Sequence, residues 1–329
     1  EWVHPTFREH FAAMALNQQL ESGKSFDEVL GERHFQPRWK ETIVTLTEMH
    51  SKSVKMVTWL ISQGLEKRKS TPIFLASDCW NAVNPVDEQS HSAVVQAFIA
   101  GLSAYDEDIR WATVVALGKV LKSTDKSALE PLTAALCDYP DISMRAAEAL
   151  VKLDSILVID KLTTAVLRGP YTYVRMFAAD ALGELGRNGE TRAVNSLISA
   201  LSDFHPEVRW HAAKALAKIG ISAVETLVSA WGSSEVDVRR GIAYALGEIG
   251  DIRGVPLLIA ALRDDEPDIR YTAAEALGKI GDSRALSELE SLVYDETPIF
   301  LGRVKDAARK AIARIRARMA QTDQQGDEQ

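Results

Sequence analysis

The residues that most often carry catalysis or bind metal ions are sparse in this sequence and do not fall at useful spacings. None of the seven histidines belongs to a His-Glu-x-x-His motif, and none stands at zinc-ligand spacing from a cysteine. The two cysteines, Cys79 and Cys137, fit no zinc spacing either, and we interpret both as buried thiols in a reducing compartment. No Gly-x-Ser-x-Gly elbow is present. The sequence therefore predicts a segment that is not an enzyme and needs no metal or cofactor.

One tetrapeptide imitates a phosphate-binding loop. Ser22-Gly23-Lys24-Ser25 matches the end of Gly-x-x-x-x-Gly-Lys-[Ser/Thr], but the first glycine of that motif would stand at position 18, which is Gln18. We predict that this tetrapeptide is a turn between two helices.

Arginine recurs at one position of a repeated segment, where it is suited to ion pairing or to ligand binding. The series is Arg110, Arg175, Arg209, Arg239 and Arg270. We interpret it as a structural ladder of ion pairs and carbonyl hydrogen bonds, with Asp203 or Asp264 among the partners. A ligand-binding arginine row is the alternative. Ser143 takes this position in the second segment, which predicts a looser step there.

The neighbouring positions carry large side chains of types enriched in the cores of protein interfaces. The position after the arginine holds Trp111, Met144, Met176, Trp210, Arg240 and Tyr271 in successive segments. Arg145, Phe177, His211 and Tyr244 belong to the two adjoining columns. One hypothesis is that these ten residues bind a partner. The other is that they pack between adjacent segments, and the sequence leaves both open.

A helical repeat must position all these residues. Six segments align without gaps, from DIRWATVVALGKV at residue 108 to DIRYTAAEALGKI at residue 268. Ile312 takes the place of the shared leucine in a weaker seventh copy. The shared leucines of the six segments are 30 to 34 residues apart: Leu117, Leu150, Leu182, Leu216, Leu246 and Leu277. A second amphipathic stretch precedes each copy. The predicted fold is an all-α, right-handed solenoid of helix–turn–helix units, with the partner-binding candidates on its concave face.

Composition and charge exclude several classes of protein. The chain has 329 residues, of which 46% are hydrophobic and 26% charged, as in ordinary globular domains. No apolar run is long enough for a spanning helix and no secretory signal is present, which predicts a cytoplasmic protein without membrane contact. The net charge of −8 argues against a general nucleic-acid binder, because such binders neutralise phosphates.

Residues 105–318 resemble the HEAT family, in particular the HEAT-like repeats named after phycobilisome (bilin) lyases. The segment Asp268–Gly281, DIRYTAAEALGKIG, is closely similar to the motif of that subclass. The resemblance implies the solenoid fold. It also offers an alternative function, a bilin lyase that attaches a tetrapyrrole to a phycobiliprotein cysteine, and a generic cytosolic scaffold is a third possibility.

A second resemblance covers about the first 60 residues. His4–Ala13, HPTFREHFAA, resembles a motif that follows the winged helix of NACHT-type signalling NTPases, and Pro37–Ile43 is similar to a stretch that often follows it in bacterial members. Many of those proteins act in antiphage defence and end in a repeat solenoid. This resemblance implies an NTPase domain upstream of residue 1, in the same protein.

Together these observations predict three regions. Residues 1–52 form a helical region after the winged helix, residues 53–318 the HEAT-like solenoid, and residues 319–329 a disordered tail. The predicted function is that of a ligand-sensing and autoinhibitory solenoid that recognises a protein partner.

Overall fold

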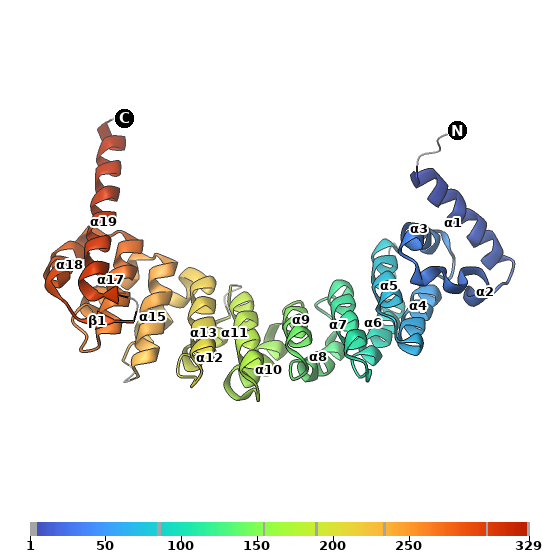
Figure 1. Cartoon of the computed structure of the whole chain (residues 1–329), viewed down its shortest axis with the longest axis horizontal. Helices are drawn as coiled ribbons and strands as arrows, with labels where there is room; N and C mark the ends of the chain where they lie inside the picture. Colours follow the sequence, from blue (N-terminus) through green and yellow to red (C-terminus); the bar gives the residue numbers. More distant parts are fainter. Residues whose placement is uncertain are drawn as a thin grey trace. The chain divides into compact units, whose positions relative to one another are not determined.

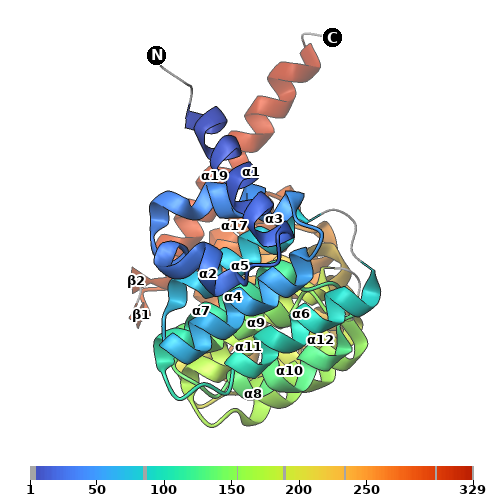
Figure 2. The same cartoon turned by 90° about the vertical axis from the view of Figure 1, so that its right-hand side faces the viewer.

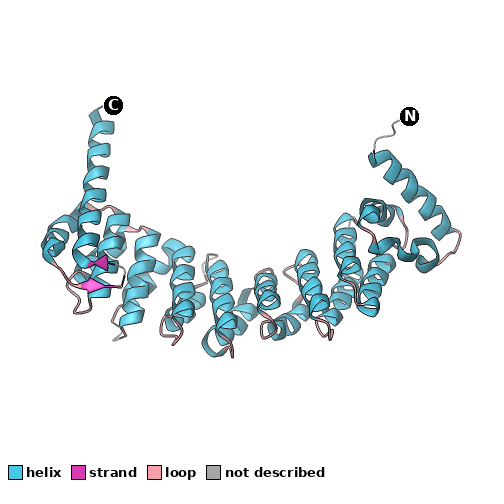
Figure 3. Cartoon of the chain, viewed as in Figure 1, coloured by secondary structure: helices cyan, strands magenta, loops and turns pink. Residues whose placement is uncertain are grey.

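The structure is a computed structural model that describes residues 5–83, 87–153, 155–187, 190–232, 235–300 and 302–327. Residues 1–4, where the His4–Ala13 motif begins, and residues 328–329 of the predicted tail lie outside the described residues. The described chain is helical almost throughout (Figure 3), which confirms the all-α solenoid. It divides into two compact units, Glu1–Val158 and Ile159–Gln329, and each is described by itself.

The N-terminal unit opens with helices that lie ahead of the aligned repeats (Figure 2). They are α1 (Pro5–Glu21), α2 (Phe26–Leu30), α3 (Lys40–Met49) and α4 (Ser53–Lys67), with 3-10 turns at Gly31–Phe35 and Pro37–Trp39. The tetrapeptide 22–25 is the predicted turn between α1 and α2. Gly23 has a φ of 98°, which favours glycine, and Ser25 caps α2 by accepting from the backbone N–H of Glu28.

The same unit continues into the repeats with α5 (Ser70–Ala82), α6 (Glu88–Gly101), α7 (Glu107–Val120), α8 (Leu129–Ala135) and α9 (Pro140–Leu150), and a 3-10 turn at Lys126–Ala128. Helices α5, α7 and α9 lie side by side as one row, and α4, α6 and α8 form the other row (Figure 1).

The C-terminal unit has the same two-row construction. It comprises most of α10 (Ser155–Arg168), then α11 (Thr172–Gly186), α12 (Thr191–Ala200), α13 (Pro206–Ile219), α14 (Val224–Ala230), α15 (Val236–Ile249), α16 (Val255–Ala261), α17 (Pro267–Ile280), α18 (Leu286–Ser291) and α19 (Val304–Asp327). Its 3-10 turns are Gly220–Ala223, Ile252–Gly254, Ser283–Ala285 and Leu292–Tyr294. Helices α11, α13, α15, α17 and α19 form one row.

The repeat leucines lie in the core between the two rows of each unit. Leu117 and Leu150 in the N-terminal unit, and Leu182, Leu216 and Leu277 in the C-terminal unit, are fully buried, and Leu246 is 1% exposed. The hydrophobic effect at these positions explains why a 30-residue period in sequence becomes a stack of helix pairs.

One feature near the C-terminus differs from the prediction of an array without strands. A short antiparallel ladder pairs β1 (Pro298–Ile299) with β2 (Gly302–Arg303) ahead of α19. Pro298 cannot donate a backbone hydrogen bond within a helix, and Gly302 has a φ of 139°, so this segment turns instead of coiling. Helix α19 runs from Val304 to Asp327, and the disorder of residues 319–329 stays a prediction.

The two thiols differ, which corrects the interpretation that both are buried. Cys79 in α5 is fully buried, whereas Cys137 lies exposed in the turn between α8 and α9. Burial raises the pKa of Cys79 to about 12, although a hydrogen bond with Thr47 opposes the shift. Cys79 is therefore protonated and unreactive in the folded state.

Maleimide labelling at neutral pH should modify one thiol in the native protein and two in denaturant. Cys137→Ser should abolish native labelling, whereas Cys79→Ala should leave it unchanged. Mass spectrometry counts the adducts, and rapid labelling of Cys79 in the native protein would contradict the burial argument.

His34 is a buried histidine in an aromatic cluster of the N-terminal unit. It is 3% exposed, and its ring centroid lies 4.0 Å from that of Phe35 and 5.0 Å from that of Trp59. Burial lowers the pKa of His34, although the Gly31 backbone, Glu32 and Asp27 oppose the shift and Lys67 adds to it.

This lowered pKa predicts that the N-terminal unit loses stability in mild acid. Because the folded state disfavours the imidazolium, the unfolded chain takes up the proton first, and stability falls as the pH drops below about 6.5. Urea unfolding at pH 7.5 and 5.5 measures the loss. His34→Phe should reduce it, and an unchanged pH dependence would assign the loss to other groups.

Candidate protein-binding face

The predicted partner-binding residues lie on the odd-numbered row of helices in each unit, which we call the second-helix face. It comprises α3, α5, α7 and α9 in the N-terminal unit and α11, α13, α15, α17 and α19 in the C-terminal unit (Figure 1). The arginine ladder sits at one end of these helices, and the large side chains follow it along the same helices.

In the N-terminal unit, Arg110 of the arginine ladder is held by contacts within the chain. The Arg110 guanidinium donates to both carboxylate oxygens of Asp138, at 2.6 and 2.9 Å, and to the carbonyl oxygens of Ala104 and Tyr105. Burial tends to raise the pKa of Asp138, but the hydrogen bonds from Arg110 and from the Tyr139 N–H outweigh it and lower that pKa. Little of this guanidinium remains for a ligand.

The same pairing recurs in the C-terminal unit. Arg175 donates to Asp203 at 2.6 Å, Arg239 to Asp264 at 3.0 Å and Arg270 to Asp295 at 2.9 Å. Two of these partners, Asp203 and Asp264, are the residues that the sequence suggested. These contacts favour the structural ladder over the ligand-binding row.

Two positions of the ladder depart from this pattern. The aspartate 28 residues after Arg209 is Asp237, which lies at the start of α15 and not in the turn before it, and the Arg209 Nε is 3.3 Å from its carboxylate. Ser143 is fully buried and its hydroxyl has no partner among the described residues. The turn that follows α10 reads Arg168-Gly169-Pro170, without an aspartate, so the second step lacks both members of the pair.

In the N-terminal unit the predicted binding residues are accessible. Trp111 of α7 is 37% exposed and packs edge-on against Phe74 of α5, with ring centroids 5.7 Å apart. Met144 and Arg145 of α9 are half-buried. The Trp111 ring is therefore held on one side by Phe74 and accessible to solvent on the other.

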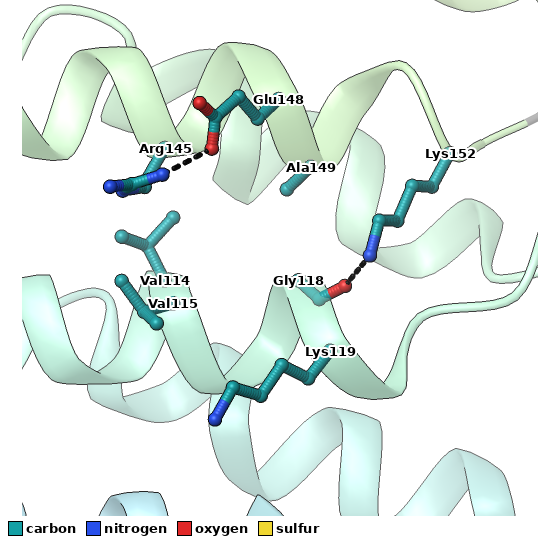
Figure 4. Close-up of a pocket in the computed structure, with 8 residues that line it drawn as sticks. All are labelled: Val114, Val115, Gly118, Lys119, Arg145, Glu148, Ala149 and Lys152. Carbon is teal, nitrogen blue, oxygen red and sulfur yellow. Dashed lines mark hydrogen bonds and ion pairs between the residues drawn. The ribbon is translucent and has the colours of Figure 1, made fainter.

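A hollow of about 200 Å³ opens beside these residues, between α7 and α9 (Figure 4). Its lining residues are Val114, Val115, Gly118, Lys119, Arg145, Glu148, Ala149 and Lys152. Arg145 donates to Glu148 at 2.7 Å, and Lys152 donates to the carbonyl oxygen of Gly118. The Arg145 Nε is shielded from solvent and has no hydrogen-bond partner among the described residues.

Wide helix spacing creates the hollow. A Cβ built on Gly118 would lie 3.7 Å from the Cβ of Ala149, which is an ordinary contact. At the matching glycines of the C-terminal unit, Gly183, Gly247 and Gly278, a Cβ would lie 2.6 to 2.8 Å from the next helix. At those three glycines the backbone of one helix lies directly against an alanine of the next helix, whereas α7 and α9 leave room for a methyl group between them.

This difference predicts opposite effects for two glycine substitutions. Gly247→Ala should lower the free energy of unfolding by about 1–3 kcal/mol, because the new methyl group would meet Ala276 of α17 at 2.6 Å. Gly118→Ala should raise it by up to about 1 kcal/mol through helix propensity. Chemical denaturation measures both, and equal destabilisation by the two variants would show that α7 and α9 are as close as α15 and α17.

In the C-terminal unit the predicted residues fall into an accessible and a buried group. Trp210 of α13 is 50% exposed, and its ring centroid lies 4.9 Å from that of Tyr244 of α15. Burial, with help from Glu248, raises the pKa of Tyr244. Tyr271 of α17 is only 7% exposed and its hydroxyl contacts Glu275, so it belongs to the packing alternative.

The remaining predicted residues of this unit are half-buried. His211 pairs with Asp180 of α11 at 2.9 Å, and Arg240 pairs with Asp237 one turn earlier in α15. Met176 and Phe177 of α11 are partly covered, and the Phe177 ring lies 6.4 Å from that of Tyr173.

A set of exposed aromatic residues at the helix-to-helix turns was not among the predicted sites. In the N-terminal unit Tyr105 is 94% and Tyr139 55% exposed, and in the C-terminal unit Tyr171 is 51% and Phe204 80% exposed. Their spacing in the sequence could have identified them, because these aromatic residues recur 32 to 34 positions apart at one place in the repeat.

Two further kinds of feature are absent from the part of the chain that the structure describes. No group of three or more His, Cys, Asp and Glu side chains is arranged to hold a metal ion there. No described helix is long and apolar enough to cross a membrane.

A family model described as HEAT repeats matches residues 95–183, 159–243 and 224–313. No curated protein matches the sequence.

Solved structures give similarity of fold. A chain of the Kap95p–RanGDP structure aligns with a TM-score of 0.58 and 14% identity, over 93% of this chain and 44% of that one. Kap121p bound to Ste12p aligns with the same score and identity, over 94% and 41%. The chain thus spans less than half of either protein. The CpcE–CpcF phycocyanin lyase of Nostoc sp. PCC7120 is 21% identical over 68% of this chain and 94% of its own, with a TM-score of only 0.33, too low to support an argument.

Proposed function

This chain belongs to the family of HEAT-repeat proteins, whose family model matches it within residues 95–313, and we propose that it is a non-catalytic, protein-binding solenoid. The proposed binding surface is the second-helix face. Solenoids of stacked helix pairs present such faces as extended recognition surfaces.

One observation carries this proposal: two tryptophans stand partly exposed on helices whose core is already complete. Trp111 and Trp210 are 37% and 50% exposed, while the leucines of the same helices, Leu117 and Leu216, are fully buried. Half-exposed tryptophans contribute little to folding but are the side chains most enriched among interface hot spots. Tyr271 is left out of the proposed surface because it is buried.

We further propose that the parent protein is a NACHT-type signalling NTPase and that this solenoid is its cytoplasmic sensor and autoinhibitory region. The support is the similarity of His4–Ala13 and Pro37–Ile43 to that family. The residues of the motif from Pro5 onward belong to α1, and Pro37–Ile43 spans a 3-10 turn and the start of α3. In this proposal, a protein recognised on the second-helix face releases the NTPase for nucleotide exchange and oligomerisation.

Peptide selection tests the binding proposal without a known partner. Peptides from a random display library are selected on the full chain, and their Kd values are measured with Trp111→Ala, Trp210→Ala and the control Phe300→Ala. The Phe300 side chain is fully exposed after β1 and is on neither α7 nor α13. We expect at least a tenfold loss for one of the tryptophan variants and no loss for the control. Equal affinity for all variants, with unchanged melting temperatures, would overturn the proposal.

The complete coding sequence tests the NTPase proposal separately. A phosphate-binding loop encoded ahead of residue 1 would support it. An upstream sequence without one, together with a bilin adduct formed on co-expression with a phycobiliprotein, would favour the lyase alternative instead.

A further inference from the structure

We infer that the hollow between α7 and α9 receives carboxylate side chains of an acidic segment in the protein partner. This inference rests on the proposed protein-binding function and assigns its chemistry to one place in the N-terminal unit. The relevant groups are Lys119 of α7, Arg145 and Glu148 of α9, and Lys152 just beyond α9 (Figure 4).

The charge around the hollow is opposite in sign to that of the whole chain. Three cationic side chains and one carboxylate line it. A further pair on the same face, Lys40 and Asp78, adds one charge of each sign, with Asp78 lying 2.9 Å from Lys40 and 3.5 Å from Lys119. Four cations therefore face two carboxylates, although the chain as a whole carries −8. Such a local excess attracts acidic groups.

In the C-terminal unit, charge at the same repeat position is neutralised within the chain. The position two residues after the repeat leucine holds Lys119 and Lys152 in the N-terminal unit, but Glu184, Lys218, Glu248 and Lys279 in the C-terminal unit. There the signs alternate, and ion pairs join Lys218 to Glu184 and Lys279 to Glu248. Lys119 and Lys152 are neighbours of like sign, so they cannot pair with each other, and Lys119 lies instead 3.5 Å from Asp78 of α5.

The donors at the hollow have spare capacity. The ammonium group of Lys152 uses one of its three N–H bonds on the Gly118 carbonyl oxygen, and the side chain is exposed. Arg145 donates to Glu148 through Nη1, one of the two terminal nitrogens of its guanidinium group. The side chains of Lys119 and Arg145 are 45% and 40% exposed, so an incoming carboxylate can reach both.

The hollow also adjoins the proposed hot spot. Trp111 precedes Val115 by one turn of α7, and Val115 lines the hollow. A partner segment that places an apolar side chain against Trp111 therefore brings its next residues over Lys119 and Arg145. We expect the segment to combine acidic residues with an aromatic or aliphatic one.

The test uses the full chain and a fluorescein-labelled ten-residue peptide with four glutamates around one phenylalanine and one leucine. A peptide with glutamine in place of each glutamate is the matched probe. Fluorescence anisotropy in 50 mM NaCl gives the Kd values. We expect the glutamate peptide to bind at least tenfold more tightly than the glutamine peptide, and the difference to shrink in high salt.

Variants of the hollow assign that binding to the site. Lys119→Gln with Arg145→Gln should weaken binding of the glutamate peptide at least tenfold, whereas Lys218→Gln, the matched lysine of the C-terminal unit, should leave it unchanged. Glu148→Gln should strengthen it, because the one opposing charge of the hollow is removed. All these side chains are at least partly exposed, so the folded state should persist.

Equal affinity for the two peptides, or an unchanged Kd in the double variant, would overturn the inference. The proposed function has a separate outcome: peptides selected from the library that depend on Trp111 but not on Lys119 and Arg145 would leave it standing. If binding of the selected peptides depended neither on Trp111 nor on Lys119 and Arg145, both the inference and the proposed function would be overturned.

Discussion

Replacing Arg175 with alanine should lower the free energy of unfolding by about 3–5 kcal/mol, the range for breaking a buried ion pair from one side. The Arg175 and Asp203 side chains are only 6% and 8% exposed, and Arg175 also donates to the carbonyl oxygen of Gly169 at 3.0 Å. Its guanidinium lies 4.7 Å from the ring centroid of Phe204. The substitution leaves a buried carboxylate without its counter-charge, and urea unfolding measures the cost.

A double variant separates the cost of the orphaned charge from the value of the pair. Arg175→Met with Asp203→Leu should recover part of the loss, because well-packed apolar side chains can replace a buried pair. The matched exposed pair is Arg316–Glu290, whose side chains are 62% and 52% exposed, and Arg316→Ala should change stability by less than about 1 kcal/mol. Equal losses for Arg175→Ala and Arg316→Ala would show that burial is unimportant at the ladder.

Leu246→Ala should cost about 2–5 kcal/mol, as expected for truncation of a buried leucine. Leu246 is 1% exposed in α15, which packs between α13 and α17. Because each repeat is stabilised by its neighbours, hydrogen exchange should accelerate in α13 and α17 as well as in α15. Protection lost in α15 alone would contradict this coupling.

The control for the leucine is an apolar side chain outside the core of the same unit. Ile252 is 62% exposed in the turn after α15. Ile252→Ala should shift the stability by no more than about 0.5 kcal/mol. A comparable loss in both variants would mean that the leucine acts through something other than burial.

The sequence by itself determined the helical repeat and the family. Apolar residues at helical spacing, with leucines recurring every 30 to 34 residues, have one low-energy solution, in which each helix pair buries its apolar stripe against the next. The recurring arginines and Asp203 or Asp264 were also readable, because charged groups at fixed places in a repeat meet their partners once per repeat.

Accessibility was decided by tertiary structure, because it depends on which helix covers a residue. Trp210 and Tyr271 occupy equivalent positions in sequence, yet Trp210 is 50% and Tyr271 7% exposed. Helix α19 packs against α17, and Asp306 of α19 contributes to the raised pKa of Tyr271, whose larger cause is burial. Cys137 lies in a turn and Cys79 in a core helix, a distinction that residue type does not carry.

The hollow between α7 and α9 is the clearest case of a feature outside the reach of sequence reasoning. The glycine at its base, Gly118, aligns with Gly183 and Gly247, but only at Gly118 is there room for a methyl group. The spacing between two helices is set by the summed contacts of both rows of helices, and not by Gly118 and Ala149 alone. The sequence specified which charged residues stand near the hollow, and the packing of α7 against α9 decided that there is space between them.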